Sequence, residues 1–435
     1  MTTVPSYEAL YEGLGASFSL EAERTDLEPI FGVPIELHTI PFVSANTNVH
    51  PPESYSFSDP TYQALVGYYA QQSPFSDRHF FQQLQLADRH IEENQRFRYL
   101  MFSPKLRDTS AHRRATLMLH GLNEKSWHKY LPWAFRLAQE TAAPVILFPA
   151  AFHLNRAPTV WSNPREMVQV ARERQRLFPA LKASTFANVA LSHRVQFAPH
   201  RFLTSSFQSY YDLLDLARSV RGGHHPLLEA GTTLDLFGYS IGASLCELLL
   251  LRNQERLFSN SRAFLFCGGS LLDQSVPVSR AIIDDAAFRG LEAYLSRLED
   301  DPRAALPRGI EGLTRRKKEL KVFQSLVFLE KLRGFRERAV RKVSARVRAW
   351  LMRDDEVFPP DGFRLSWSTE RGERLLAARV VEPSYSYKHE QPFPVRSPVG
   401  GEAEAFFTEL VAAAAEHLHL HRRRNLTPTV GIGIV

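Results

Sequence analysis

A serine held between glycines is the residue of this sequence best placed for nucleophilic chemistry. Ser240 is the centre of a Gly-Tyr-Ser-Ile-Gly segment, with an apolar run at 234–237 before it and a helix-forming run at 243–251 after it. A strand that turns into a helix within one residue holds that residue in a strained backbone conformation and tolerates only small neighbours. We therefore predict that Gly238 and Gly242 permit the turn and that Ser240 projects from the sheet edge.

Backbone amides near this serine could stabilise negative charge on a substrate. The helix that begins at Ile241 points free N–H groups at the serine oxygen, and the N–H of Ile241 itself is the expected first oxyanion donor. A loop at 120–124 follows an apolar run at 115–119, and the N–H of Leu122 is the expected second donor. We expect three residues beside these donors to contact the substrate, namely Gly121, Asn123 and Tyr239.

A serine hydroxyl becomes an effective nucleophile when a histidine accepts its proton and a carboxylate orients that histidine. Two residues downstream of Ser240 could do this. Asp355 lies in an acidic cluster at 354–356 directly after an expected strand, and His389 lies in a loop after the last expected strand. Ser240, Asp355 and His389 are therefore the predicted catalytic triad.

Other residues could take the places of the acid and the histidine. Asp354 competes with Asp355 because a shift of one residue reverses the side to which a strand side chain points. Asp273, just beyond an expected strand at 263–267, is a further candidate acid. The competing histidines lie on the expected closing helix, at His417, His419 and His421. On a helix the first and last of these share a face but the middle one does not, so no metal site is predicted there.

The order of elements along the chain indicates how these residues are positioned. From residue 114 onward, short apolar runs alternate with helical patterns, which is typical of a parallel sheet with crossover helices. Strands are expected at 115–119, 144–148, 234–237, 263–267, 346–352 and within 376–381, and helices at 127–140, 166–176, 205–221, 243–251 and 402–421. Residues 278–342 are expected to be almost wholly helical, with breaks at Pro302, at 307–309 and at Gly334. Earlier in the chain, strands are expected within 30–49 and at 97–102, and helices at 62–69 and 76–93.

In these motifs the chain resembles the α/β-hydrolase superfamily. The resemblance rests on the loop at 120–124, the glycine-flanked Ser240, the acidic cluster with Asp355, and His389, and it covers roughly residues 97–425. It implies a mostly parallel eight-stranded sheet flanked by helices, with a helical lid between the sixth and seventh strands. The expected parts are an accessory region at 1–96 packed on the core, a hydrolase core in two pieces at 97–272 and 345–435, and a basic lid at 273–344.

One loop departs from the pattern of this superfamily. Members that act on small esters or epoxides often carry an Asp and a Gly-rich turn after the fourth strand, whereas this chain has an apolar loop at 148–156. Within that loop, Asn155 and Arg156 could contact substrate or pair with acidic groups at the surface. The loop therefore leaves the substrate class open.

Composition limits the classes of function. With 435 residues, 44% hydrophobic and 23% charged, the chain is long enough for a large core and is unlike disordered or fibrous proteins. No basic region followed by an apolar stretch opens the sequence, and the apolar run at 245–251 is too short to cross a bilayer. A cytoplasmic protein without a transmembrane segment is therefore expected. The two cysteines, Cys246 and Cys267, are expected to be buried free thiols.

Positive charge is concentrated in one segment. The net charge is +6, but residues 303–348 contain fifteen Lys or Arg against four Glu, so the rest of the chain is net negative. Apolar residues recur there at helical spacing and indicate a buried face made of Leu320, Phe323, Leu326, Val327, Leu332 and Phe335. The basic residues are expected to form a solvated face that includes Arg315 to Lys318, Lys321, Lys331, Arg336 and Arg338. The functional alternative is attraction of an anionic substrate or a membrane surface, whereas no motif supports nucleic-acid binding.

These observations predict a serine hydrolase of the carboxylic-ester type. It would cleave an ester or related acyl bond of a small substrate through an acyl-enzyme on Ser240, without a metal or organic cofactor. The same triad could serve an acyltransferase or a thioesterase. A hydrolase fold used only for binding is a further alternative, in which Asp355 and His389 should not come within hydrogen-bond reach of Ser240.

Overall fold

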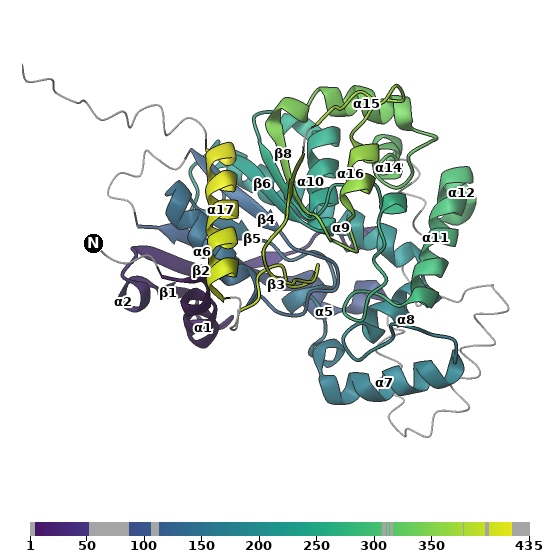
Figure 1. The fold of residues 1–435 in the computed structure, drawn as a ribbon, viewed down its shortest axis with the longest axis horizontal. Helices are drawn as coiled ribbons and strands as arrows, with labels where there is room; N and C mark the ends of the chain where they lie inside the picture. The colour runs from purple at the N-terminus through teal and green to yellow at the C-terminus, as the bar shows by residue number, and fades with distance from the viewer. Residues whose placement is uncertain are drawn as a thin grey trace, which may run out of the picture.

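One mixed sheet organises the chain (Figure 1). The computed structural model describes residues 5–51, 87–105, 113–306, 310, 313, 316–376, 378–395 and 400–419. The strands follow the order β1-β2-β3-β5-β4-β6-β7-β8-β9 across the sheet. They are β1 (Arg24–Asp26), β2 (Ile35–Val43), β3 (Arg96–Pro104), β4 (Arg114–Leu119), β5 (Val145–Leu147), β6 (Thr233–Tyr239), β7 (Ala263–Phe266), β8 (Val347–Met352) and β9 (Ala378–Val381).

Strand direction divides this sheet into two parts. Strands β5, β4, β6, β7, β8 and β9 are parallel, whereas β1, β2 and β3 pair antiparallel with their neighbours. The central parallel strands are buried on both faces, which is why they read as continuous apolar runs. The predicted mostly parallel sheet flanked by helices is confirmed, with nine strands rather than eight in the part of the chain that the structure describes. Strands β1 and β2 of the predicted accessory region, residues 1–96, belong to this same sheet because β2 pairs along its whole length with β3.

Helices cover both faces of the sheet. One face carries α1 (Tyr7–Ser17), α6 (Tyr130–Thr141) and α17 (Gly400–Leu418), and the other carries α9 (His200–Gly222), α10 (Ile241–Arg252) and α14 (Lys317–Gln324). The remaining described helices are α2 (Glu28–Phe31), α5 (Glu92–Gln95), α7 (Pro164–Leu177), α8 (Val189–Phe197), α11 (Asp285–Asp300), α12 (Pro302–Ala305), α15 (Arg333–Arg341) and α16 (Pro360–Ser366). None of the helices in the described ranges is both long and apolar enough to span a bilayer.

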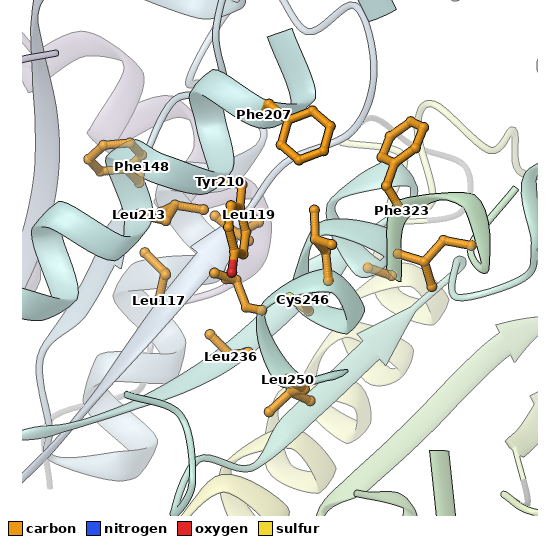
Figure 2. Close-up of a cluster of buried hydrophobic side chains, with 14 of the residues drawn as sticks. Leu117, Leu119, Phe148, Phe207, Tyr210, Leu213, Leu236, Cys246, Leu250 and Phe323 are labelled. Carbon is orange, nitrogen blue, oxygen red and sulfur yellow. The ribbon is translucent and has the colours of Figure 1, made fainter. Parts of the chain in front are cut away.

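The core consists of two layers, one on each side of the sheet. Because successive side chains of a strand point to opposite faces, Leu117 and Leu119 of β4 pack toward α9 and α10, whereas Met118 packs toward α6 and α17. Figure 2 shows the first layer, in which the sheet residues meet Leu213 of α9 and Cys246 of α10. Both cysteines are buried and free, as predicted. Strand β6, which leads into Ser240, therefore lies between two apolar layers.

The segment between β7 and β8 is less regular than its sequence predicts. It contains α11, α12, α14 and α15, but the prediction of helix from residue 278 is wrong at its start, where Val278 and Ile283 form an isolated bridge. Gly334 does not break the helix, since it lies near the start of α15. Pro302 is the first residue of α12, a position where its fixed φ suits a helix and its missing N–H has no intrahelical partner to lose.

Arg336 departs from the solvated face predicted for it. Its side chain is buried, with Nη2 donating to Glu247 Oε2 of α10 at 2.9 Å and Nε donating to Ser366 O at 3.1 Å. Burial raises the pKa of Glu247 to about 7 even though the guanidinium opposes this. The spacing of the apolar residues predicts that Arg336 lies on the polar side of its helix. That side packs against helix α10, whose buried Glu247 pairs with the guanidinium. This ion pair joins the basic segment to the helix that follows Ser240.

The start of one further helix differs from its prediction. Helix α9 begins at His200, earlier than the start predicted at Ser205, whose hydroxyl donates to Phe202 O at 3.1 Å. A serine inside a helix can return its hydroxyl to the preceding turn, so Ser205 is compatible with the helix interior and does not mark its start. The predicted helices at 62–69 and, up to residue 86, at 76–93 lie outside the described residues, as do Arg315 and His421.

Buried histidines make the folded state sensitive to acid. Burial lowers the pKa of His120, His225 and His417 to about 4 and that of His153 to about 3. An unfolded histidine titrates near 6.5, so the unfolded chain binds more protons between these values. The stability that these neutral rings contribute is present above pH about 6.5 and is lost as the pH falls toward 4. We expect the free energy of unfolding to fall by roughly 1.4 kcal/mol per pH unit for each proton taken up, as urea titrations at pH values near 7 and 5 would measure.

A matched pair of variants isolates one of these histidines. The His417 Nε2 donates to Arg346 O at 3.1 Å, and a glutamine amide can make the same bond without titrating. His417→Gln should therefore reduce the pH dependence of unfolding, whereas the same change at the exposed His224 should leave it unaltered. Equal slopes for the wild-type chain and both variants would contradict the prediction for His417.

Candidate active site

Ser240 occupies a strained turn between β6 and α10. Its backbone angles are φ 57° and ψ −129°, a region that residues with a Cβ rarely adopt. The residue is the N-cap of α10, and its side chain makes no capping bond to the helix. Only 3% of Ser240 is exposed. The local structure therefore holds the hydroxyl at the carboxyl edge of the sheet, free to meet groups from other loops.

Three glycines make this turn possible. A Cβ on Gly238 would lie 2.6 Å from Ala243 Cα, and a Cβ on Gly242 would lie 2.4 Å from Leu119 O. A Cβ on Gly268, in the loop after β7, would lie 2.2 Å from the Ser240 carbonyl oxygen. The first two glycines are those that the sequence motif predicts. Gly268 was not predicted because its contact partner is distant in sequence and comes from a neighbouring strand.

We expect Gly242→Ala to destabilise the protein by at least about 2 kcal/mol, because the added methyl meets backbone atoms that cannot rotate away. Its control is Gly290→Ala inside α11, where the nearest heavy atom to the new Cβ is 3.9 Å away. Alanine favours a helix interior over glycine by roughly 0.5–1 kcal/mol, so the control should be neutral or stabilising. Urea unfolding of both variants measures the difference, and a Gly242→Ala protein as stable as the wild type would contradict the argument.

Ser240, His389 and Asp355 form a continuous hydrogen-bonded chain. The Ser240 hydroxyl lies 2.8 Å from His389 Nε2, and His389 Nδ1 lies 2.9 Å and 3.0 Å from the two carboxylate oxygens of Asp355. Because a carboxylate only accepts, Nδ1 carries the ring proton and Nε2 is left to accept the serine proton. Asp355 Oδ1 also accepts the backbone N–H groups of Val357 and Phe358, each at 2.9 Å. All three side chains of this chain are buried.

The competing candidates do not reach this histidine. Asp354 is exposed, and its backbone N–H donates to the Tyr387 hydroxyl at 2.7 Å. Asp273 accepts the N–H of Leu329 at 3.1 Å and faces the segment between β7 and β8. His417 is buried against the start of β8, where it donates to Arg346 O, rather than forming part of a solvated basic helix end. The register of the chain after β8 therefore points Asp355 inward and Asp354 outward.

Packing fixes the orientation of the His389 ring. The Tyr239 ring is stacked on it with a centroid distance of 5.6 Å and an interplanar angle of 14°, and the Phe358 ring lies 5.6 Å away. The Tyr239 hydroxyl donates to the backbone carbonyl of His389. Tyr239 is buried and does not line the cavity at Ser240, so its observed contacts are with the histidine loop. Its predicted contact with substrate stays a prediction.

Cys267 adds a further group beside the acid. It directly follows β7, has a positive φ of 48°, and its side chain hydrogen bonds to Asp355. Burial raises the pKa of the Cys267 thiol far above its ordinary value, and the Asp355 charge raises it further. The thiol therefore stays protonated and acts as a donor to the carboxylate.

Two backbone N–H groups beside Ser240 are unused. Among the described residues, the N–H groups of Leu122 and Ile241 donate to no protein acceptor. Gly121 lies against Ser240, since a Cβ on it would be 3.3 Å from the serine Cβ. The Leu122 and Ile241 groups thus flank the serine from the loop after β4 and from the start of α10. Free N–H groups in this position can stabilise an oxyanion that forms next to the serine oxygen.

His120 anchors the loop that carries Leu122. The N–H of Ala150 donates to His120 Nε2 at 2.8 Å, so the ring proton lies on Nδ1, which donates to Gly121 O at 2.8 Å. Burial keeps this ring neutral by lowering its pKa. The side-chain amide of Asn123 holds the same loop by donating to Ala187 O at 2.9 Å and Ala281 O at 2.6 Å. Asn123 does not line the cavity at Ser240, and its predicted substrate contact also stays a prediction.

A polar bridge joins the loop after β4 to the histidine loop. Lys129 forms an ion pair with Glu124 and donates to Glu390 O at 3.0 Å, and Glu124 also accepts the Tyr130 hydroxyl at 2.6 Å. The Lys129 ammonium lies over the Tyr239 ring, 4.8 Å from its centroid. Sequence reasoning missed this bridge. The sequence signal for this bridge is a pair of charged residues around the start of the helix expected at 127–140, with Glu124 before the helix and Lys129 in its first turn. Charged residues in such positions are usually solvated.

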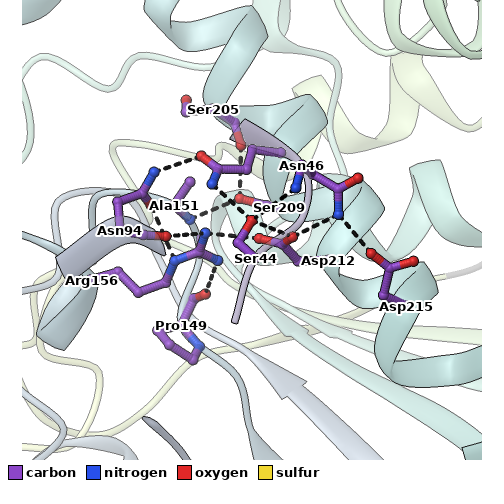
Figure 3. Close-up of polar contacts among 12 residues, drawn as sticks. Ser44, Asn46, Asn94, Pro149, Ala151, Arg156, Ser205, Ser209, Asp212 and Asp215 are labelled. Atoms are coloured by element: carbon purple, nitrogen blue, oxygen red, sulfur yellow. Dashed lines mark hydrogen bonds and ion pairs between the residues drawn. The ribbon is translucent and has the colours of Figure 1, made fainter. Parts of the chain in front are cut away.

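The loop after β5 is held by a buried polar network (Figure 3). The N–H of Ala151 donates to Ser209 Oγ of α9 at 2.9 Å, and Arg156 donates to Asp212 at 2.8 Å and to Pro149 O at 3.1 Å. Arg156 is fully buried, so neither a substrate contact nor a surface ion pair fits it. Its guanidinium carbon lies over the Phe97 ring, 4.0 Å from the ring centroid. The network gives the loop a defined shape beside Ser240.

A mostly apolar cavity opens at Ser240. Leu122 and Ile241 lie beside the serine, and Phe202 of α9 forms one wall. The opposite wall comes from α11 and the segment around it, with Ile282, Phe288, Leu291 and Leu295. A second cavity shares Leu122, Phe202 and Ile241 and continues past Gly121 to the loop after β5. The space around the serine therefore suits an apolar chain more than a polar one.

Residues 5–419 match a family of unknown function, DUF6051. The chain belongs to this family. No curated protein matches it. The description of this family assigns no activity.

Several solved structures are similar to this chain at low identity. Carboxyl esterase 2 from the mycorrhizal fungus Tuber melanosporum is 12% identical over 74% of this chain and 81% of that chain, with a TM-score of 0.41. The peroxisomal alpha-beta-hydrolase Lpx1 from Saccharomyces cerevisiae is 15% identical over 75% and 81%, with a TM-score of 0.38. A cold-adapted esterase from an Arctic intertidal metagenomic library is 13% identical over 74% and 88%, with a TM-score of 0.37.

Proposed function

We propose that this protein is a serine hydrolase that cleaves an ester or related acyl bond, with Ser240 as the nucleophile. The observation that carries the proposal is the hydrogen-bonded chain from Asp355 through His389 to Ser240, at a strained strand-to-helix turn beside two unused N–H groups. A fold used only for binding would not need these three groups within hydrogen-bond distance. Their convergence favours catalysis over that alternative.

The geometry supports the following steps. His389 Nε2 accepts the Ser240 proton as the serine oxygen bonds to the acyl carbon, and the N–H groups of Leu122 and Ile241 hold the oxyanion. The tetrahedral intermediate then expels the alcohol, which takes the proton from His389, and the acyl group remains on Ser240. A water molecule, deprotonated by His389, attacks the acyl-enzyme and releases the acid. Asp355 stabilises the charged His389 ring in both halves of the reaction and keeps the ring proton of the neutral form on Nδ1. The N–H groups of Val357 and Phe358 hold the carboxylate in place by hydrogen bonding to it.

The acyl group would bind in the apolar cavity, and residues 273–344 would act as its lid. In support, α11 contributes Phe288, Leu291 and Leu295 to the cavity wall, and Val327 and Phe328 close it from the turn after α14. Covering a reacting site with apolar side chains excludes water and strengthens the electrostatic interactions inside. We therefore expect acyl chains of several carbons to be cleaved better than acetyl.

Labelling with a fluorophosphonate probe tests the proposal. Such a probe reacts only with a serine whose hydroxyl is activated and whose oxyanion site is intact. The expected result is one labelled peptide, containing Ser240, found by mass spectrometry of the digested protein. A folded protein that stays unlabelled, or one labelled at another serine, would overturn the assignment. Product analysis with added alcohols would then separate hydrolysis from acyl transfer, which uses the same intermediate.

A further inference from the structure

Lys129 lies between two loops that carry different parts of the candidate active site. Its ammonium forms an ion pair with Glu124 of the loop after β4 and donates to Glu390 O of the histidine loop at 3.0 Å. Glu390 directly follows His389 in the chain. Only 14% of the Lys129 side chain is exposed. One largely buried side chain therefore contacts both the loop with the expected oxyanion donor Leu122 and the loop with the expected base.

On the side of the loop after β4, these contacts reach Gly121. Glu124 Oε1 accepts the Tyr130 hydroxyl at 2.6 Å, and the Tyr130 oxygen accepts the N–H of Gly121 at 3.0 Å. A Cβ on Gly121 would lie 3.3 Å from Glu124 Oε1 and 3.3 Å from Ser240 Cβ, so this glycine is close to both the carboxylate and the nucleophile. The position of the loop beside Ser240 therefore depends on a carboxylate that Lys129 holds.

On the side of the histidine loop, Lys129 acts at two points. Its ammonium lies over the Tyr239 ring, 4.8 Å from the centroid, and the Tyr239 ring is stacked on the His389 ring. The Tyr239 hydroxyl donates to His389 O, and the next carbonyl oxygen, Glu390 O, accepts from Lys129. Two successive carbonyl groups of the histidine loop are thus held by neighbouring side chains, while the imidazole is packed against a ring that Lys129 covers.

The histidine loop also contacts the wall of the cavity. The Ser279 hydroxyl donates to the Glu390 carboxylate, and Ser279 Oγ accepts the N–H groups of Ala281 and Ile282 at 3.2 Å and 3.0 Å. Ile282 lines the cavity at Ser240. The residue whose carbonyl oxygen binds Lys129 therefore also holds the segment that forms part of the cavity wall.

We propose that Lys129 is a positioning residue, which holds the loop after β4 and the histidine loop in register across Ser240. The inference rests on the proposed function and concerns the geometry in which that reaction occurs. The oxyanion donors and His389 have to act on one acyl carbon at the same time, and a displacement of about 1 Å can lower a rate by about a hundredfold. An ammonium suits this place because its three N–H groups can bind a carboxylate and a carbonyl oxygen together.

Kinetics of Lys129→Met test the role of the ammonium. We expect kcat for a neutral para-nitrophenyl ester to fall by about 10- to 100-fold, with KM within about threefold of the wild type, because the cavity that binds the ester is unchanged. Lys129→Arg should restore most of kcat, since a guanidinium can donate to the same two acceptors. The control is Lys388→Met, which changes an exposed lysine next to His389 and should leave kcat within about twofold of the wild type. Unfolding curves fix a temperature at which every variant is folded.

A transition-state analogue gives a readout that a merely structural role would not move. With a trifluoromethyl ketone, the Ser240 oxygen bonds to the ketone carbon, the serine proton passes to His389, and the carbonyl oxygen becomes the oxyanion. Binding of this ketone depends on both loops, whereas binding of an uncleaved ester to the Ser240→Ala protein depends on the cavity. Lys129→Met should weaken the ketone by about 10- to 100-fold and change the Kd of the ester less than about twofold. Equal losses for both ligands would overturn the positioning role.

Glu124→Gln tests the same bridge from its other end and replaces Lys129→Met if that variant does not fold. The glutamine carbonyl oxygen can still accept the Tyr130 hydroxyl, but the ion pair with Lys129 is lost. We expect a loss of kcat of about tenfold, which should not add to that of Lys129→Met in the double variant, because the two residues act as a unit. Fully additive losses would contradict the bridge.

The rate of fluorophosphonate labelling separates this inference from the proposed function. Labelling of Ser240 in the wild type, with at least about tenfold slower labelling of Lys129→Met, supports both. If Ser240 is labelled at the same rate in the wild type and in Lys129→Met, the positioning role is wrong and the hydrolase stands. If Ser240 is not labelled in the folded wild-type protein, both are wrong.

Discussion

Replacing Ser240 with alanine is expected to lower kcat for ester hydrolysis by about a million-fold, to a rate set by the oxyanion donors and binding alone. The serine oxygen is the atom that bonds to the acyl carbon, and the alanine methyl offers no substitute. The fold should tolerate the change, because Ser240 makes no capping bond to α10 and, among the described residues, its hydroxyl hydrogen bonds only to His389. Hydrolysis of a para-nitrophenyl ester by purified protein, with unfolding curves alongside, measures both effects.

The matched control for this variant is Ser259→Ala. Ser259 is exposed in the turn before β7, on the opposite edge of the sheet, and its change should leave kcat within about twofold of the wild type. A Ser240→Ala protein that keeps more than about one per cent of the activity would show that another residue is the nucleophile. The same variant should also lose all fluorophosphonate labelling. Activity and labelling must disappear together for the assignment to hold.

Asp355→Asn is expected to lower kcat by about ten-thousand-fold. The N–H groups of Val357 and Phe358 both donate to Oδ1, so an asparagine would keep its carbonyl oxygen there and turn its NH₂ toward His389 Nδ1. That NH₂ can only donate, which moves the ring proton to Nε2 and removes the acceptor for the serine proton. The carboxylate charge that stabilises the imidazolium is lost as well. Steady-state kinetics over a pH series measure the loss.

Asp354→Asn is the matched control, one residue away. Asp354 is exposed and contributes its backbone N–H, which the substitution retains, to the Tyr387 hydroxyl. Its kcat should stay within about twofold of the wild type. If the two variants lost activity to the same extent, the effect would come from the local charge of the acidic cluster and not from a single orienting carboxylate. The pair therefore decides which of the neighbouring acids serves the histidine.

The turn around Ser240 could be predicted because its determinants are local. A strand, two glycines and a helix within a few residues specify a strained backbone, and the structure gives the steric reason in the contacts that a Cβ on Gly238 or Gly242 would make. The parallel sheet could also be predicted, because strands buried on both faces read as apolar runs wherever they lie in the chain. The order of Ser240, Asp355 and His389 followed from the same pattern of strands.

Contacts between distant segments could not be predicted in this way. The position of Gly268 against the Ser240 carbonyl, the bridge of Lys129 between two loops, and the burial of Arg336 each depend on a partner supplied by another element. A basic residue in an amphipathic helix is usually solvated, and only the helix packed against it decides otherwise. The irregular start of the segment between β7 and β8 has the same origin, since Val278 and Ile283 pair with each other instead of continuing a helix.

The sequence by itself determined the strained turn that holds Ser240, because the residues that specify a strand-to-helix turn are neighbours in the chain. It also determined the class of fold, through the spacing of its apolar runs. Only the tertiary structure decided which aspartate faces the histidine, and only it brought α11 and the turn after α14 to the wall of the cavity at Ser240. The residues of that wall are far from Ser240 in the chain, so their position depends on how the elements pack. For this reason the candidate nucleophile could be predicted from local sequence, whereas the lining of the cavity beside it could not.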